Sequence, residues 1–292
     1  MAVINYKEDD KRRLDVFMAQ RKPKLSRSYI STQISSGGIK VNGRAVKTGY
    51  RLKSGDKISY VSLNLSEPRP KTIDLPILYE DDFCIVINKP SGIITHAKGF
   101  AASEGSVASF IAPKIKFANL SNRSGIVHRL DRGTSGVIIT AKTEAASKYL
   151  QSQFAKRQTR KTYLAIISGR LEHDQAAINM PIERNPKHPS TFRTGINGKP
   201  ALTEYEVIKT NSHYSLVKLT PKTGRTHQLR VHLNALNHPI VGDNFYNGEA
   251  ADRLMLHAYA LEVILPGIGR KQFRAPLPDE FKKYFKNLPK EL

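Results

Sequence analysis

The hydrophobic positions near the start of the chain follow a helical period. Leu14, Phe17 and Met18 are three and four residues apart, which places them on one face of a short amphipathic helix. A second helix is expected to begin near Ser28 and to end at the Gly-Gly pair 37–38. The pattern therefore predicts a helix pair.

An extended pattern follows the helix pair. Residues 39–41 and 57–61 have the apolar and polar alternation of short strands, and Asn-Gly at 42–43 is a strong hairpin signal. Residues 63–74 have no hydrophobic period and contain two prolines, so they read as a linker. We predict a small α/β domain over residues 1–62.

Residues 75–292 are dominated by β-branched and apolar runs typical of strands. These runs are 83–87, 137–140, 163–167, 205–208, 215–219 and 261–265. A helix is expected behind Thr143 as N-cap, and another from Thr226 to the residue before His238. The pattern predicts an α+β domain with a large, mostly antiparallel sheet.

Charge suggests what kind of partner the chain binds. The 47 Lys and Arg outnumber the 25 Asp and Glu, which gives a net charge of +22. The excess of basic residues is spread along the chain and not confined to one tail. A spread-out positive field favours a polyanion, since each neutralised phosphate releases counterions. The alternatives are a solubility device or a membrane-surface binder, but the sequence has no lipidation signal and no basic amphipathic anchor.

The sequence lacks the signals of a membrane span, a secretory signal peptide, a nucleotide-binding loop and a metal site. No stretch approaches the ~18 apolar residues of a membrane span, the N-terminus has no signal-peptide core, and Cys84 is the single cysteine. We therefore expect a cytoplasmic protein without disulfides. Neither GxxxxGK[ST] nor GxGxxG occurs, and His227 and His232 lie roughly 140° apart on a helix. We expect no nucleotide, metal or redox cofactor.

The segment 125–140 is the strongest candidate for chemistry. An apolar stretch leads into Asp131, which stands between Arg129 and Arg132 and precedes Gly-Thr-Ser-Gly and a second apolar stretch. A carboxylate in this position sits on a rigid scaffold, and the small residues let a substrate approach closely. On spacing alone, the favoured interpretation is structural: Asp131 caps the turn and pairs with Arg129 or Arg132.

The run His-Arg-Leu-Asp-Arg-Gly-Thr-Ser-Gly at 128–136 resembles the signature of the RluA family of pseudouridine synthases. Further family-like segments follow the expected order, at 88–96, 160–165, 199–205 and 223–230. The resemblance implies that Asp131 is the catalytic nucleophile and that Tyr163 is the active-site tyrosine. It also implies that Arg225 is the basic residue that pairs with the Asp131 carboxylate. It also implies RNA contacts by Lys89, His128 and Arg129.

The first domain resembles the S4 RNA-binding domain. The residues that carry this resemblance are 13–15, 26–28 and 39–44. It implies RNA contacts by four basic residues, which are Lys24, Arg27, Arg44 and Lys47. The alternative is that these cations form only a solvated face of a small structural module.

Together these resemblances imply an enzyme that isomerises uridines in structured RNA. The N1–C1′ bond breaks, the uracil turns and a C5–C1′ bond forms, and Tyr163 would stack on the base and help to remove the C5 proton. Because family members with an S4 domain usually act on large-subunit ribosomal RNA, we expect that substrate and a monomer. The alternatives are a synthase acting on transfer RNA and a non-catalytic RNA-binding or ribosome-assembly factor. An RNA methyltransferase would need a glycine-rich cofactor loop, which is absent from the sequence.

Overall fold

The computed structural model describes residues 2–22, 25, 27–61, 71, 73–96, 104–117, 125–285 and 287–288. The chain forms two compact units. One holds residues 1–73, 96–109 and 118–124, and the other holds residues 74–95, 110–117 and 125–292. The two units are described separately below.

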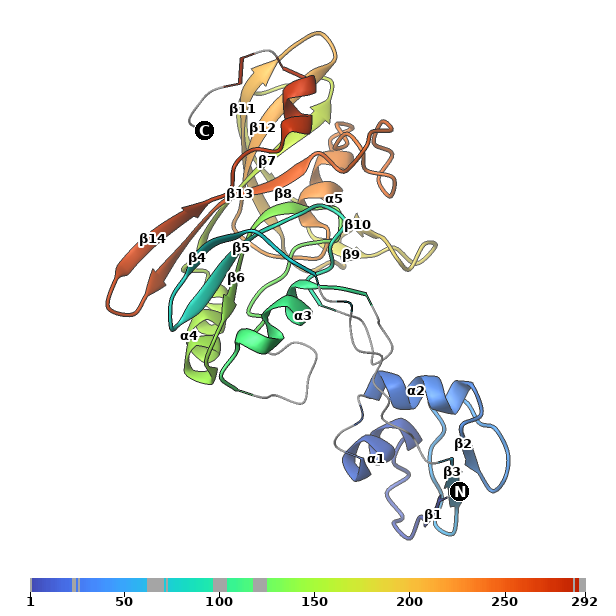
Figure 1. Ribbon diagram of the computed structural model, residues 1–292. Helices are drawn as coiled ribbons and strands as arrows, with labels where there is room; N and C mark the ends of the chain where they lie inside the picture. Colours follow the sequence, from blue (N-terminus) through green and yellow to red (C-terminus); the bar gives the residue numbers. More distant parts are fainter. Residues whose placement is uncertain are drawn as a thin grey trace. The chain divides into compact units, whose positions relative to one another are not determined.

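The first unit contains the predicted helix pair and a small antiparallel sheet (Figure 1). Its elements are β1 (Ala2–Asn5), α1 (Leu14–Arg21), α2 (Arg27–Ser35), β2 (Ile39–Val41) and β3 (Lys57–Tyr60). The strands pair in the order β1-β3-β2. Leu14, Phe17 and Met18 are buried, as the helical spacing predicted. Asn42 and Gly43 both have positive φ, as the predicted Asn-Gly turn requires.

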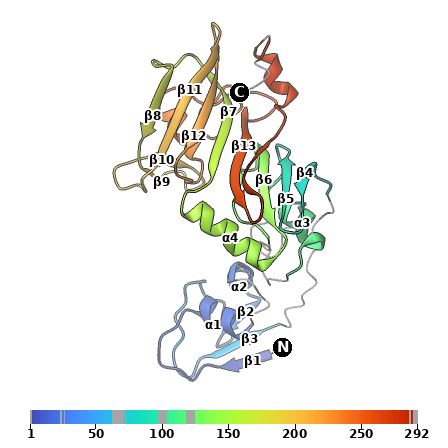
Figure 2. The same cartoon turned by 90° about the vertical axis from the view of Figure 1, so that its left-hand side faces the viewer.

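The second unit is built on a large sheet, in which nine strands of the described residues take part. The strands are β4 (Ile77–Glu80), β5 (Cys84–Lys89), β6 (Ser135–Ala141), β7 (Arg160–Ser168), β8 (Gln175–Asn179), β11 (Leu202–Thr210), β12 (Tyr214–Pro221), β13 (Leu256–Leu265) and β14 (Gly269–Arg274). Their order is β4-β5-β6-β13-β7-β12-β11-β8 (Figure 2). β14 pairs with β13 (Figure 1). Only β6 and β13 pair in parallel among these strands. The predicted α+β class and mostly antiparallel sheet are confirmed.

Two longer helices pack against this sheet. α4 (Glu144–Ala155) begins behind Thr143, whose hydroxyl accepts a hydrogen bond from the Ala146 N–H at 3.1 Å, as predicted. α4 packs on β6 and β13. α5 (Gln228–Ala235) buries Leu229 and Leu233 in the core formed with β7 and β12. It starts at Gln228 and not at Thr226, because His227 adopts a left-handed conformation with φ of 56°.

The described residues also contain several shorter elements. They are α3 (Val107–Ile111), the 3-10 helices Ala112–Lys114 and Asp279–Lys283, and a two-stranded hairpin of β9 (Ile182–Arg184) and β10 (Phe192–Thr194). The hairpin contacts α5.

Gly136 makes the centre of the sheet possible. It has φ of 108°, and a Cβ atom at this position would lie 2.2 Å from the Ala258 carbonyl oxygen. Only glycine allows β6 and β13 to approach this closely. The loop that carries Asp131 leads directly into β6, so this close strand packing also fixes the base of the loop.

Candidate active site

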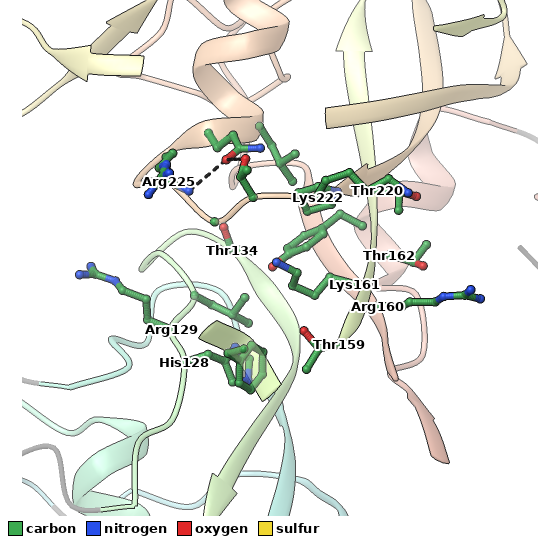
Figure 3. A pocket seen from close by; sticks show the side chains of 18 of the residues that line it. His128, Arg129, Thr134, Thr159, Arg160, Lys161, Thr162, Thr220, Lys222 and Arg225 are labelled. Carbon is green, nitrogen blue, oxygen red and sulfur yellow. Dashed lines mark hydrogen bonds between the residues drawn. The ribbon is translucent and has the colours of Figure 1, made fainter. Parts of the chain in front are cut away.

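Asp131 lies in a cavity of about 1030 Å³ in the second unit. The cavity is lined by the loop before β6, the start of β7 and the segment that leads into α5 (Figure 3). Cations are frequent in its lining and include Arg129, Lys161, Lys222 and Arg225. The side chain of Asp131 is 19% exposed, so its carboxylate is accessible while most of the residue is covered.

The loop after β5 holds the Asp131 loop in place. Thr95 Oγ1 donates a hydrogen bond to the Leu130 carbonyl at 2.8 Å and accepts one from the Leu130 N–H at 3.1 Å. Ser91 Oγ donates to the Gly133 carbonyl at 2.7 Å. These bonds fix the backbone on both sides of Asp131.

Lys89 belongs to this support and not to the RNA-facing surface. It is 0% exposed, and its ammonium group donates to the carbonyl oxygens of Pro90, Ile93 and Arg132 at 2.9, 2.7 and 3.2 Å. Burial lowers the pKa of Lys89 to about 7. The predicted RNA contact is therefore wrong. All three donors bind backbone inside the protein, so Lys89 ties the two loops together.

The cation that pairs with Asp131 is Arg230, and the prediction of Arg225 in this role was wrong. Arg230 Nη1 lies 3.6 Å from Asp131 Oδ2. Arg225 instead donates from Nε to the Pro200 carbonyl at 3.0 Å. Both arginines belong to the segment 223–230, but Arg225 precedes α5 whereas Arg230 lies within it. Arg225 still lines the cavity (Figure 3), where it can contact a substrate.

Arg230 is in turn fixed by Asp243. Its Nε and Nη2 donate to Asp243 Oδ2 and Oδ1, both at 2.7 Å, and Asp243 is 1% exposed. Such a bidentate pair fixes the plane of the guanidinium as well as its position. A second carboxylate thus determines where the positive charge beside Asp131 lies.

His227 is a site residue that the sequence analysis assigned no role. Its Nε2 lies 3.8 Å from Asp131 Oδ2, and its Nδ1 is 2.8 Å from the Tyr246 hydroxyl. Burial lowers the pKa of His227, which favours the neutral imidazole. Its place beside Asp131 follows from the left-handed turn before α5, and the residue spacing gives no signal of that turn.

Tyr163, on β7, lines the same cavity. Burial, with the nearby Asp131 carboxylate, raises the pKa of Tyr163, so its hydroxyl stays protonated at neutral pH. A substrate therefore meets an aromatic ring with a neutral phenol. This state suits stacking on a base, and it makes the phenol oxygen a weak proton acceptor.

His128 and Arg129 are adjacent in sequence but differ in their surroundings. His128 Nε2 accepts the Ile139 N–H at 3.0 Å, and its ring stacks on Phe154 with centroids 4.5 Å apart. Burial lowers the pKa of His128 to about 3, which favours the neutral imidazole. Because His128 also lines the cavity, its contact with RNA stays a prediction. Arg129 is exposed at the cavity, and no hydrogen bond or ion pair of its side chain is found within the described part of the chain.

Comparison with known proteins shows the family to which this chain belongs. The family model described as RNA pseudouridylate synthase matches residues 83–235, which include the Asp131 loop, Tyr163 and Arg230. The chain belongs to this family. A second model, the S4 domain, matches residues 12–58.

Similar proteins support the assignment of this chain to the pseudouridine synthase family. The ribosomal large subunit pseudouridine synthase D of Borreliella burgdorferi is 36% identical, and the match covers 95% of this chain and 90% of that protein. An uncharacterized RNA pseudouridine synthase of Aquifex aeolicus is 38% identical over 84% of this chain and 80% of its own length. Among solved structures, human RNA pseudouridylate synthase domain containing 1 matches with a TM-score of 0.57 and 30% identity, over 70% of this chain and 83% of that one. The chain is an RNA pseudouridine synthase.

The basic residues predicted in the S4 domain of the synthase have different surroundings. Arg27 binds the buried carboxylate of Asp15 with Nε and Nη2, both at 2.9 Å, while its side chain remains 56% exposed. Arg44 and Lys47 are exposed. Lys24 lies outside the described residues. Arg27 therefore stabilises the domain in addition to any RNA contact.

Two kinds of feature are absent from the described residues of the synthase. These residues contain no group of three or more His, Cys, Asp and Glu that could hold a metal ion. They also contain no helix long and apolar enough to cross a membrane.

Proposed function

We propose that this pseudouridine synthase modifies specific uridines of large-subunit ribosomal RNA and that Asp131 is its nucleophile. The observation that carries the proposal is the position of the Asp131 carboxylate, which is accessible in a large basic cavity with Arg230 3.6 Å away. Tyr163 lines the same cavity and offers a ring to the base. A turn cap or a structural ion pair would not require these groups to converge on an open cavity.

The proposed reaction rearranges bonds within one nucleotide. The N1–C1′ bond breaks, the uracil turns and C5 bonds to C1′; the C5 proton is lost and N1 gains one, so the product is an isomer. Asp131 can act by adding to C1′, by adding to the base or by taking a sugar proton, and each path uses the same carboxylate. Arg230 places a positive charge 3.6 Å from that carboxylate, and the Tyr163 ring positions the base.

The target uridine must leave its helix or loop to reach Asp131. Unstacking a base costs a few kcal/mol, which contacts made by the extruded nucleotide have to offset. Arg129 is exposed at the cavity and has no internal partner within the described residues, so its guanidinium is free to occupy the space that the base vacates. Stacking of an arginine on neighbouring bases is a known mode of RNA recognition.

The substrate assignment rests on relatives and on the S4 domain. Relatives named ribosomal large subunit pseudouridine synthase D or C, from Nitrosomonas europaea and Vibrio cholerae, match 95% and 91% of this chain. A basic S4 domain adds sequence-independent affinity for a large folded RNA. That the enzyme is a monomer stays a prediction, and so does its place in the cytoplasm.

The test combines an RNA map with a purified variant. Pseudouridine is mapped across ribosomal and transfer RNA from cells with and without the protein, and a fragment around each lost site becomes the substrate in vitro. Asp131→Asn keeps the size of the side chain but removes the nucleophilic carboxylate, so conversion should fall below detection while RNA affinity changes little. Asp82→Asn, at a 95% exposed aspartate, is the matched control and should convert the fragment normally.

Each outcome has a defined meaning. Conversion by Asp131→Asn near the wild-type rate would remove Asp131 as the nucleophile. Sites lost only from transfer RNA would overturn the ribosomal assignment. A normal map in cells without the protein would contradict the proposed enzymatic role of this chain in those RNAs.

A further inference from the structure

A second cavity of about 510 Å³ lies beside the catalytic cavity in the same unit. It is formed by the β9–β10 hairpin with its connecting loop, one face of α5 and the segment 244–247. Its volume is in the range of ligand-binding pockets, about 300–1,000 Å³. None of the predicted site residues lines it, and the reaction described above does not use it.

A layer of aromatic side chains lies between the two cavities. His227 lines the catalytic cavity, and Phe192 and Tyr246 line the second one. The ring of His227 lies edge-on to both, with centroid distances of 5.7 Å to Phe192 and 5.6 Å to Tyr246. The Tyr246 hydroxyl also accepts the Phe192 N–H at 3.0 Å. The second cavity is therefore a single layer of side chains away from a neighbour of Asp131.

Phe245 forms an exposed aromatic platform in the second cavity. Its side chain is 59% exposed, although burial of a phenylalanine side chain is normally favourable. The guanidinium carbon of Arg230 lies 5.4 Å from the centre of the ring, so the covered side of Phe245 rests on the cation that pairs with Asp131. Exposed aromatic rings next to cations are the usual platforms for unpaired bases.

Side-chain amides supply the polar groups of this cavity. Asn234, Asn244 and Asn247 line it, and their amides have no hydrogen-bond partner in the described part of the chain. Asn185 Oδ1 accepts the Lys187 N–H at 3.0 Å, so its NH₂ group is available. An amide offers a donor and an acceptor side by side, which matches the edge of a nucleobase.

The surrounding charge suits a nucleic acid. Arg184 and Lys187 are exposed on the β9–β10 hairpin. The Arg184 guanidinium carbon lies 5.2 Å from the centre of the Phe192 ring, so it sits over the aromatic layer. Cations at the rim and a ring with free amides inside are the two components of single-strand recognition.

We propose that the second cavity binds the base of an unpaired nucleotide that flanks the target uridine. The base stacks on Phe245, and the amide of Asn234 or a neighbouring asparagine binds its edge. The cavity would thereby set which sequence contexts are modified. This inference rests on the proposed function, because it assumes an RNA substrate whose target base enters the Asp131 cavity.

The experiment is a double-mutant cycle between protein and RNA. The probe is the ribosomal fragment mapped in the test above. It is compared with a set of RNAs of the same sequence, each of which has one abasic site at one of the two nearest positions on either side of the target. Binding is measured in the Asp131→Asn background with and without Phe245→Leu. At one position, loss of the base should weaken binding roughly 5- to 100-fold, the range typical of one stacked base. Phe245→Leu should weaken binding of the intact RNA similarly but add little on that abasic RNA.

The cycle separates stacking from a structural effect. If Phe245 only supports Arg230, Phe245→Leu will cost the same on intact and abasic RNA, and the inference is wrong. Asn234→Ala should reduce discrimination among the four bases at the coupled position. Tyr149→Leu, at a 39% exposed aromatic that lines neither cavity, is the matched control and should show no coupling.

The outcomes for function and for the second cavity are distinguishable. If the wild-type protein fails to convert the intact fragment, the proposed function is at fault. If it converts the fragment but no abasic position couples to Phe245, the second cavity does not hold a flanking base.

Discussion

Asp243 holds Arg230 through two hydrogen bonds of 2.7 Å, and this pairing orients the guanidinium beside Asp131. Because Asp243 is 1% exposed, solvent does not compete for these bonds. The Arg230 to Asp131 distance of 3.6 Å is longer, so Asp131 is the less tightly held carboxylate. That difference leaves Asp131 available to a substrate while Arg230 stays fixed.

Arg230→Lys should therefore damage catalysis although it keeps the charge. Lysine cannot reproduce the bidentate contact with Asp243, so its ammonium would not be fixed beside Asp131. We expect conversion of uridine to fall on the order of 100-fold, as for loss of one preorganised electrostatic group. Arg225→Lys is the matched control from the same segment and should reduce conversion far less. A larger loss with Arg225→Lys would return the partner role to Arg225. Melting temperatures of both variants check the fold.

Substitutions of Tyr163 separate the ring from the hydroxyl. Tyr163→Phe keeps the ring, so RNA binding should persist, and a slower turnover would assign the hydroxyl a proton-transfer role. Tyr163→Leu should lose more, because stacking on a base is worth ~1–3 kcal/mol. Single-turnover conversion and RNA affinity are measured for both variants. Wild-type rates in both would place Tyr163 outside the reaction.

His257 should make the protein less stable in mild acid. It is 0% exposed, burial lowers its pKa to about 4, and its Nδ1 lies 2.8 Å from Ser135 Oγ. Between the pKa of about 6.5 in the unfolded chain and about 4 in the folded one, only the unfolded state binds the proton. The free energy of unfolding should thus fall through this window as pH drops, by about 3 kcal/mol at most from this residue.

The His257→Asn variant isolates this effect from the other histidines. Asparagine does not titrate, so the stability gap between wild type and variant should narrow from pH 7 to pH 4. Denaturant titrations at each pH give the two free energies. A gap independent of pH would show that His257 binds protons equally in the folded and unfolded states.

The S4 domain should contribute a salt-dependent part of RNA affinity. Arg44 and Lys47 are exposed, and Arg44→Gln with Lys47→Gln removes two cations. If both contact phosphates, affinity should fall, and the slope of log affinity against log salt should become shallower by about 2. The control is Lys282→Gln with Lys283→Gln, because these lysines already bind Asp279 and Asp252. Equal slopes in wild type and the Arg44/Lys47 variant would mean that these residues do not touch the RNA.

Local patterns predicted the elements of both units well. The spacing of Leu14, Phe17 and Met18 gave α1, and the cap at Thr143 gave α4, because both signals depend on residues within a few positions of each other. The start of α5 was missed by two residues. His227 is held in its left-handed conformation among Phe192, Tyr246 and Asp131, and such contacts across the fold leave no periodic trace.

The sequence by itself determined the α+β class, the family and the loop that carries Asp131, since these depend on ordered motifs and hydrophobic period. Only the tertiary structure decided that Arg230 and not Arg225 pairs with Asp131, because that choice depends on Asp243, which lies outside the motif and fixes the guanidinium. It also decided that Lys89 is buried and that its ammonium group donates to three backbone carbonyl oxygens. The second cavity likewise exists only where the β9–β10 hairpin, α5 and residues 244–247 meet. A basic or polar side chain reads the same in sequence whether it faces RNA or the protein interior, and packing between distant segments makes that distinction.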